Sequence, residues 1–219
     1  MSEPILILGA SGSGKSTAMR NLDPEHTLII SIDGKRPPFS MKGWSAISSK
    51  EPKGNFFKPP RSNVYGLCKS AIKTAIENGK KVIVIDDSQF LLANSFFERA
   101  EERGYDKFSQ MGKSFWQLIE FCRDQPEDIT IYFLHHLEYT EQGHIKPKTI
   151  GKMLDQQGCV EGRFTICLLA EKVEEEHVIR TSMANQPVIK APMGMFDQEE
   201  IDNDLKIIDD TVREYYGIS

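Results

Sequence analysis

Short apolar runs alternate with amphipathic stretches along the first two thirds of the chain. Continuous runs of aliphatic and β-branched residues, which are typical of strands buried on both faces, lie at 5–8, 27–32, 82–85 and 129–134. Between and after them, helical spacing or helix signals occur at 15–21, 64–78, 90–103 and 113–124. This alternation predicts an α/β fold with a mainly parallel central sheet and helices on both faces.

The pattern changes after residue 138. A polar stretch, 139–158, precedes three short apolar segments that we expect to be antiparallel strands near the carboxyl end of the chain: 164–169, 178–183 and 188–190. Residues 199–216 predict a closing helix. Because no repeat or low-complexity segment divides the chain, we expect residues 1–219 to form a single domain.

The richest local signal is the turn between the first strand and the first helix. Gly9 is followed, after four residues, by Gly14-Lys15-Ser16, the complete pattern of a phosphate-binding P-loop. In such a turn, backbone N–H groups point into a concavity that holds an anion. Lys15 is expected to reach the β and γ phosphates, and Ser16 to bind Mg²⁺. We call residues 9–17 the glycine-rich loop and expect all of them to bind ATP: Gly9, Ala10, Ser11, Gly12, Ser13, Gly14, Lys15, Ser16 and Thr17.

A second acidic ligand for Mg²⁺ is expected at the end of another strand. Asp86 ends the apolar run 82–85, and we expect this strand to lie beside the one that carries the glycine-rich loop. Asp86 would then hold the metal ion together with Ser16, directly or through water. The neighbouring Asp87 could orient water or be a solvated turn or helix-cap residue, and we favour the second interpretation.

Two further strand ends carry candidates for the chemistry of a bound triphosphate. Asp33 follows the second strand, where it either positions the attacking water or belongs to an Asp-Gly turn. His135 and His136 follow the strand at 129–134, and a hydrogen bond to the γ-phosphate and a structural role are both open to them. We favour His136, because neighbouring residues of a strand point to opposite faces.

Charge is unevenly distributed along the chain. The net charge of −5 argues against a protein that binds nucleic acid over its whole surface. Residues 33–61 nevertheless hold seven basic residues against two acidic ones, whereas 197–214 hold eight acidic residues against two basic ones. The Pro-, Gly- and Ser-containing residues 34–61 are expected to form a long surface loop. Its cations and interleaved aromatic residues suit single-stranded DNA or are simply solvated; the candidate contacts are Lys35, Arg36 and Lys42.

Composition limits the class of protein. The chain is 39% hydrophobic and 27% charged, values typical of ordinary soluble domains. No apolar run approaches the length of a membrane span. The four cysteines are scattered without a CxxC pair, and the first strand begins at residue 5, so we expect reduced thiols, no signal peptide and a cytoplasmic location.

The order of these motifs resembles the RecA-like P-loop ATPase core, and specifically the small phage-encoded RecA-like ATPases tied to single-strand annealing and recombination. Besides the glycine-rich loop, the resemblance rests on IVIDD at 83–87 and IYFLHH at 131–136. It also rests on the tail, IRTSMANQPVIKAPMGMF at 179–196 followed by IDNDLKIIDDTVREYYG. The resemblance covers nearly the whole chain and implies a RecA-like fold.

The resemblance also implies roles for particular residues. Asp33 matches the position of the family's catalytic glutamate, although it is shorter, and His136 matches the polar sensor after the central strand. Lys190 matches a lysine that RecA-like filaments insert into the ATP site of the neighbouring subunit. Residues 139–158 match the second DNA-binding loop, which makes three lysines candidate DNA contacts: Lys146, Lys148 and Lys152.

The resemblance implies an ATP- and Mg²⁺-dependent oligomer, in a ring or a filament, that acts on single-stranded DNA in the cytoplasm of a phage host. It further allows a single-strand annealing or single-strand binding protein as a partner, with no membrane involved. Two alternatives stay open. One is a nucleotide or small-molecule kinase, although the polar stretch 139–158 lacks the arginines of a kinase lid. The other is an assembly module that binds ATP with negligible turnover.

Overall fold

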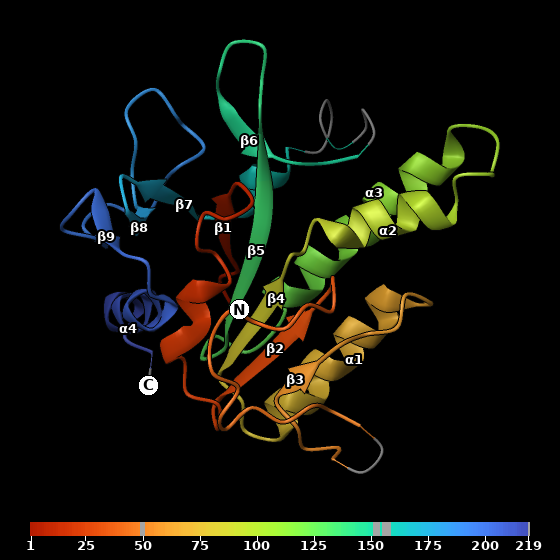
Figure 1. Ribbon diagram of the computed structural model, residues 1–219, viewed down its shortest axis with the longest axis horizontal. Helices are drawn as coiled ribbons and strands as arrows, with labels where there is room; N and C mark the ends of the chain where they lie inside the picture. Colours follow the sequence, from red (N-terminus) through yellow and green to blue (C-terminus); the bar gives the residue numbers. More distant parts are fainter. Residues whose placement is uncertain (49–50, 151–153, 155–158, 219) are drawn as a thin grey trace.

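The computed structural model describes residues 1–48, 51–150, 154 and 159–218 (Figure 1). Within that part of the chain, nine strands form one sheet in the order β3-β2-β4-β5-β1-β7-β8-β9, with β6 paired to β5. The strands are β1 (Ile5–Gly9), β2 (Thr27–Ser31), β3 (Phe56–Phe57), β4 (Val82–Asp86), β5 (Thr130–Tyr139), β6 (Ile145–Pro147), β7 (Ile166–Val173), β8 (Glu176–Arg180) and β9 (Glu200–Asp202). The helices are α1 (Val64–Glu77), α2 (Phe90–Glu98), α3 (Asp106–Arg123), α4 (Leu205–Tyr216) and the short 3₁₀ helices η1 (Thr17–Asn21) and η3 (Val160–Arg163).

The centre of the sheet is parallel, from β3 through β2, β4, β5 and β1 to β7, whereas β8 and β9 are antiparallel additions. This confirms the predicted α/β fold, with β8 and β9 as antiparallel strands near the carboxyl end. The expectation that the segment at 164–169 is also an antiparallel addition is wrong, because β7 pairs in parallel with β1. The expectation that the strand of Asp86 lies directly beside β1 is wrong, because β5 lies between them: Ile5 pairs with Tyr132, and Tyr132 pairs with Val84. The carboxyl ends of β1, β5 and β4 still share one edge of the sheet.

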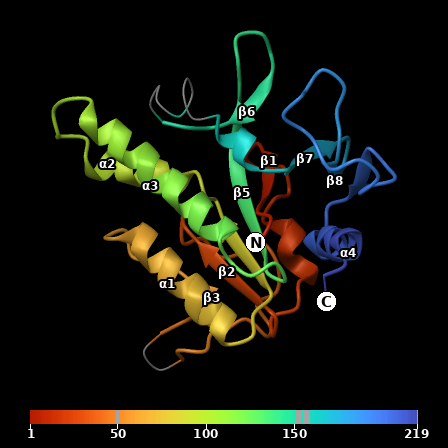
Figure 2. The ribbon, with the colours of Figure 1, turned by 180° about the vertical axis from the view of Figure 1, so that it is seen from behind.

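Helices cover both faces of this sheet (Figures 1 and 2). Leu6 and Leu8 of β1 belong to a buried cluster with α1, α2 and α3, whereas Ile5 and Ile7 belong to a second cluster with η1 and α4. Successive side chains of a strand point to opposite faces, and here both faces are covered. A strand in this position must therefore be apolar at every residue, which explains the continuous runs in the sequence.

The carboxyl end differs from the sequence prediction. The closing helix was expected over 199–216, but Glu200–Asp202 form strand β9 on β8, and α4 begins at Leu205. The Asp204 carboxylate accepts a hydrogen bond from the Lys206 N–H, which caps the helix at that point. The predicted strand at 188–190 is reduced to one antiparallel bridge between Lys190 and Cys167.

The basic loop at 34–61 is more ordered than predicted. It contains β3, which pairs with β2, and its side chains Phe39 and Trp44 pack against the core on the η1 and α4 face. Asn55 is buried and donates to the carbonyl oxygens of Pro24 (2.7 Å) and Gly43 (3.0 Å). Phe39 and Trp44 thus contribute to the packing of this loop, and contact of the loop with single-stranded DNA stays a prediction.

The polar stretch at 139–158 begins as a hairpin. β5 continues to Tyr139, beyond the predicted end at residue 134, and returns as β6 with Tyr139 paired to Ile145. The helices predicted at 90–103 and 113–124 also have different limits, since α2 ends at Glu98 and α3 already begins at Asp106. Among the described residues, no helix has both the length and the apolar character needed to cross a membrane.

Candidate functional site

The glycine-rich loop connects the carboxyl end of β1 to η1. Gly12 (φ 78°) and Gly14 (φ 93°) have left-handed backbone conformations that other residues rarely adopt. At Gly9 the reason for glycine is space, because a Cβ atom there would lie 2.3 Å from Ser13 Oγ and 2.7 Å from the Ala170 carbonyl oxygen. The helix that follows is a single 3₁₀ segment, Thr17–Asn21, rather than the longer helix predicted over 15–21. The loop thus has the tight, concave backbone that its sequence predicts.

Lys15 lies inside this concavity. Its Nζ donates to the carbonyl oxygens of Gly9 and Ala10, each at 2.8 Å, and the side chain is buried. Burial lowers the pKa of Lys15 to about 8, although Asp87 and Asp86 act in the opposite direction. The Ser13 hydroxyl is also buried and has no hydrogen-bond partner in the part of the chain that the structure describes. A loop with a buried ammonium and an unsatisfied hydroxyl fits a polyphosphate, which accepts hydrogen bonds from both.

Ser16 and Asp86 meet as the sequence predicted, despite the intervening strand. Ser16 Oγ donates to Asp86 Oδ1 at 2.9 Å, and Asp86 is only 6% exposed. Burial and the neighbouring charge of Asp87 raise the pKa of Asp86 to about 7. No group of three or more metal-ligating side chains occurs among the described residues. The pair fits Mg²⁺, which usually keeps several waters and takes one or two carboxylates together with phosphate oxygens.

Asp87 and His136 form a second polar pair in the same place. Asp87 occupies a turn, as expected, with a left-handed backbone (φ 56°), but its carboxylate faces inward and lies 3.2 Å from His136 Nε2. Burial acts to raise the pKa of Asp87, but the hydrogen bond to His136 and the nearby cations outweigh it and lower that pKa. His135 points to the opposite face of β5, where it is fully buried and contacts Ser88 and Lys148. His136 therefore lines the cavity and His135 does not, while the preference for His136 as a γ-phosphate contact stays a prediction.

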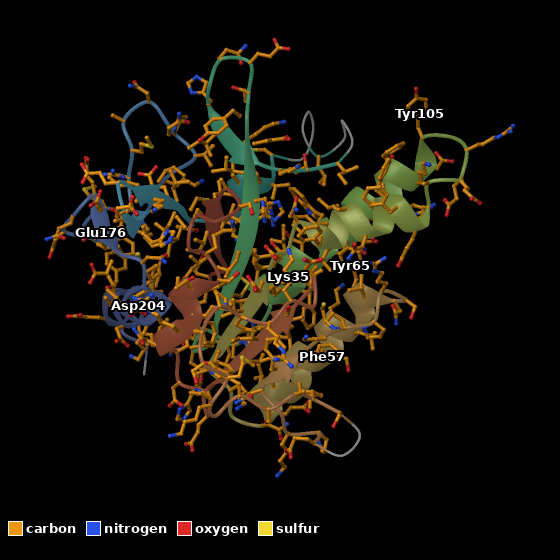
Figure 3. All side chains as sticks on the ribbon, viewed as in Figure 1. Lys35, Phe57, Tyr65, Tyr105, Glu176 and Asp204 are labelled. Atoms are coloured by element: carbon orange, nitrogen blue, oxygen red, sulfur yellow. The ribbon has the colours of Figure 1, made fainter. Side chains whose placement is uncertain are left out.

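These side chains surround one cavity of about 430 Å³ at the edge of the sheet. Two residues expected to contact DNA, Lys35 and Arg36, also line it, and Figure 3 labels Lys35 near the centre of the view. Lys35 Nζ lies 2.6 Å from Asp33 Oδ2 and 5.6 Å from the centre of the Phe90 ring. The hydrogen bond to Asp33 raises the pKa of Lys35. The cavity lining is Ser11, Gly12, Ser13, Gly14, Lys15, Ser16, Thr17, Lys35, Arg36, Pro37, Pro38, Asp86, Asp87, Phe90, His136 and His177.

Other predicted residues lie outside this cavity. Asp33 is not among the lining residues, and its carboxylate faces Lys35. Lys190 is held by backbone hydrogen bonds to Cys167 of β7, also outside the lining. Lys42 is exposed on the basic loop.

The candidate DNA-binding lysines of 139–158 have separate environments. Lys146 of β6 lies 3.0 Å from Glu138 of β5. Lys148 donates its backbone N–H to the His136 carbonyl oxygen (2.8 Å), and its own carbonyl oxygen lies 2.9 Å from His135 Nε2. Lys152 lies outside the described residues. The hairpin that carries Lys146 and Lys148 is thus attached to the two histidines of β5.

No protein-family model and no curated protein matches this chain. The function therefore has to be argued from the residues and their arrangement. Two titratable residues of the cavity lining, Asp87 and His177, were not predicted as site residues. The doublet Asp86-Asp87 was a usable signal for the first. His177 had no sequence signal, because the antiparallel return of β8 alone brings it to the glycine-rich loop.

Proposed function

We propose that the chain is a RecA-like P-loop ATPase that binds ATP with Mg²⁺ and acts as an oligomer on single-stranded DNA, in phage-type recombination or strand annealing. The observation that carries this proposal is the convergence of the glycine-rich loop, the buried Lys15 and the Ser16–Asp86 pair on one cavity. Each element has the residue type and position that binding of a triphosphate requires.

The position of β5 supports the RecA-like part of the proposal. This strand lies between β1 and β4 and carries His136 at the edge where the loop and Asp86 lie. The resemblance requires a polar residue after the central strand, and His136 meets that requirement with its ring directed to the cavity. The antiparallel strands β8 and β9 and the closing helix α4 correspond to the tail on which the resemblance also rests.

The chain supplies the groups that hydrolysis needs. Backbone N–H groups of the loop and Lys15 bind the phosphates, while Lys35 and Arg36 add positive charge at the other wall of the cavity. Mg²⁺, when bound by Ser16 and Asp86, would neutralise charge on the β and γ phosphates. Asp87, ionised and hydrogen-bonded to His136, is placed to orient the attacking water.

The hairpin β5–β6 supports a link between DNA and hydrolysis. Its lysines Lys146 and Lys148 belong to the segment expected to bind DNA, and Tyr139 at its end is 65% exposed. The backbone of Lys148 bonds to both His135 and His136. A strand of DNA that moves this hairpin would therefore move the Asp87–His136 pair.

The decisive experiment measures phosphate release from ATP with Mg²⁺, with and without single-stranded DNA, while particle size is followed in parallel. We expect DNA to stimulate release and Lys15→Ala to abolish it, with Lys113→Ala, an exposed position on α3, as the matched control. DNA affinity should fall steeply with salt because phosphate contacts release counterions. Transfer of phosphate to an acceptor would instead establish a kinase, and tight binding without turnover an assembly module. Unchanged turnover in Lys15→Ala would contradict the P-loop assignment.

A further inference from the structure

The antiparallel end of the sheet packs directly on the glycine-rich loop at Gly14. A Cβ atom at Gly14 would lie 2.6 Å from Asn203 Nδ2 and 2.9 Å from His177 Cγ. Asn203, between β9 and α4, donates from Nδ2 to the Gly14 carbonyl oxygen at 3.0 Å and is only 4% exposed. Gly14 is therefore needed both for its left-handed backbone and for this close approach. The contact joins residues of the last third of the chain to the phosphate-binding loop.

Two polar atoms at this contact are buried and have no hydrogen-bond partner among the described residues: His177 Nδ1 and Asn203 Oδ1. A buried acceptor without a partner costs less than a buried donor without one, which favours assignment of the ring proton of His177 to Nε2. Because His177 lines the cavity and its Nδ1 is buried, Nε2 is the ring nitrogen left for a ligand in the cavity. His177 thus presents an N–H donor that the triphosphate chemistry described above does not use.

The arrangement of the cavity residues indicates how a bound nucleoside triphosphate would be oriented. Asp86, Asp87 and His136 come from β4 and β5, on one side of β1, and they mark the end where the γ-phosphate and the metal ion belong. His177 comes from β8, on the other side of β1. A ligand anchored through its phosphates on the loop between them must extend its other end toward β8. That end of a nucleotide is the nucleoside.

We propose that His177 is a nucleoside-binding residue, which donates a hydrogen bond from Nε2 to the ribose or base of the bound nucleotide. This inference rests on the proposed function and extends it from the phosphates to the rest of the substrate. The Asn203 side chain donates a hydrogen bond to Gly14 of the loop, and the backbone carbonyl oxygen of Asn203 accepts one from Arg20 of η1.

The residue that caps α4 also contacts η1, the helix that follows the glycine-rich loop. Asn21 of η1 donates to the Asp204 carboxylate at 2.5 Å, and Arg20 lies 3.9 Å from it. Figure 3 shows Asp204 at the start of α4 and Glu176 at the start of β8, both in the carboxyl-terminal part of the molecule. Since these contacts fix η1 to the segment that follows β9, the positions of His177 and the loop are set together.

The test compares ATP with inorganic tripolyphosphate, which has the phosphates but no nucleoside, by calorimetry with Mg²⁺ present. We expect the unmodified protein to bind ATP more tightly than tripolyphosphate. His177→Ala should weaken ATP binding about three- to tenfold, the effect of one hydrogen bond, and leave tripolyphosphate binding unchanged. His177→Gln, which offers an amide N–H, should restore part of the loss. His144→Ala removes an exposed histidine of the β5–β6 hairpin and should change neither ligand.

Several results would overturn this inference. Equal affinity of the unmodified protein for ATP and tripolyphosphate would show that no nucleoside is recognised. ATP binding unaffected in His177→Ala, or an equal loss for both ligands, would show that His177 does not contact the nucleoside. If His177→Ala fails to fold, His177→Gln decides: it should bind ATP more weakly than the unmodified protein and tripolyphosphate equally well, and an unchanged affinity for ATP would contradict the inference. Binding of neither ligand by the unmodified protein would instead refute the proposed function itself.

Discussion

Asp86 and Asp87 are adjacent in the chain, yet their environments give them opposite acid–base character. Burial raises the pKa of Asp86 to about 7, whereas His136 and nearby cations, acting against burial, lower the pKa of Asp87. Pairs of carboxylates whose pKa values are pushed apart usually have different tasks. Asp86 contacts Ser16 and suits the metal ion, while Asp87 stays ionised beside His136 and suits the attacking water.

This difference predicts which carboxylate positions the water. Asp87→Asn should lower hydrolysis about a hundredfold or more, the usual contribution of a general base, while ATP binding persists. Asp33→Asn, in a residue outside the cavity lining, should have an effect of less than about threefold. Single-turnover phosphate release measures the first quantity and calorimetry the second. The reverse order of the two variants would restore Asp33 as the catalytic carboxylate, as the family resemblance implies.

At the scale of elements, one buried histidine of β5 connects this strand to the segment that follows β6. His135 contacts Ser88 Oγ at 2.8 Å and the Lys148 carbonyl oxygen at 2.9 Å. Burial lowers the pKa of His135 to about 4; the charges of His136 and Lys15 act in the same direction, while the Lys148 hydrogen bond and Asp87 oppose them. The native protein therefore keeps this ring neutral at a pH where the unfolded chain would protonate it.

The low pKa of His135 makes the unfolding free energy of the protein depend on pH. Because the pKa in the folded state is below that in the unfolded state, stability is lost as the pH falls through the unfolded value of about 6.5 toward 4. Between about pH 8 and about pH 5, we expect the unmodified protein to lose about 2 kcal/mol more unfolding free energy than His135→Gln. Urea unfolding at both pH values checks this. Equal losses in the two proteins would mean that His135 is not held neutral.

Much of the fold could be predicted because the parallel strands are buried on both faces. Runs such as 82–85 admit few alternatives, and their ends were predicted to within a residue or two. The prediction failed where polar residues make strands, because the extension of β5 through Glu138 and the whole of β9 have no continuous apolar run. Both depend on pairing with a neighbour, β6 or β8, that local sequence does not reveal.

Some residues of the candidate site could be predicted from the sequence, whereas others could not. Lys15, Ser16 and Asp86 are tied to local patterns, a glycine-rich turn and an apolar run ending in Asp, and the structure brings them together. Lys35 was assigned to DNA on charge alone, and charge does not distinguish a cavity wall from an open surface. His177 could not be predicted, since only the packing of β8 against Gly14 brings it to the cavity.

At the scale of the whole molecule, Lys190 is a test of assembly. Its backbone pairs with Cys167 in the sheet, and it is not among the residues that line the cavity of its own chain. The proposed oligomer would bring it to the ATP site of the next subunit, where a cation supplied in trans stabilises the charge that develops on the γ-phosphate. Lys35 and Arg36 line the cavity within the same chain and offer the competing source of that charge.

Lys190→Ala separates the two sources. The substitution keeps the backbone bridge to Cys167, so the chain should fold and bind ATP normally while its hydrolysis falls. If the lysine acts in trans, mixing Lys190→Ala with Lys15→Ala restores part of the activity, because a Lys190→Ala subunit with an intact loop then receives Lys190 from its neighbour. The measurement is phosphate release across mixing ratios and protein concentrations. Activity that is independent of concentration, with no rescue at any ratio, would assign the charge to Lys35 and Arg36 and make each chain a self-sufficient ATPase.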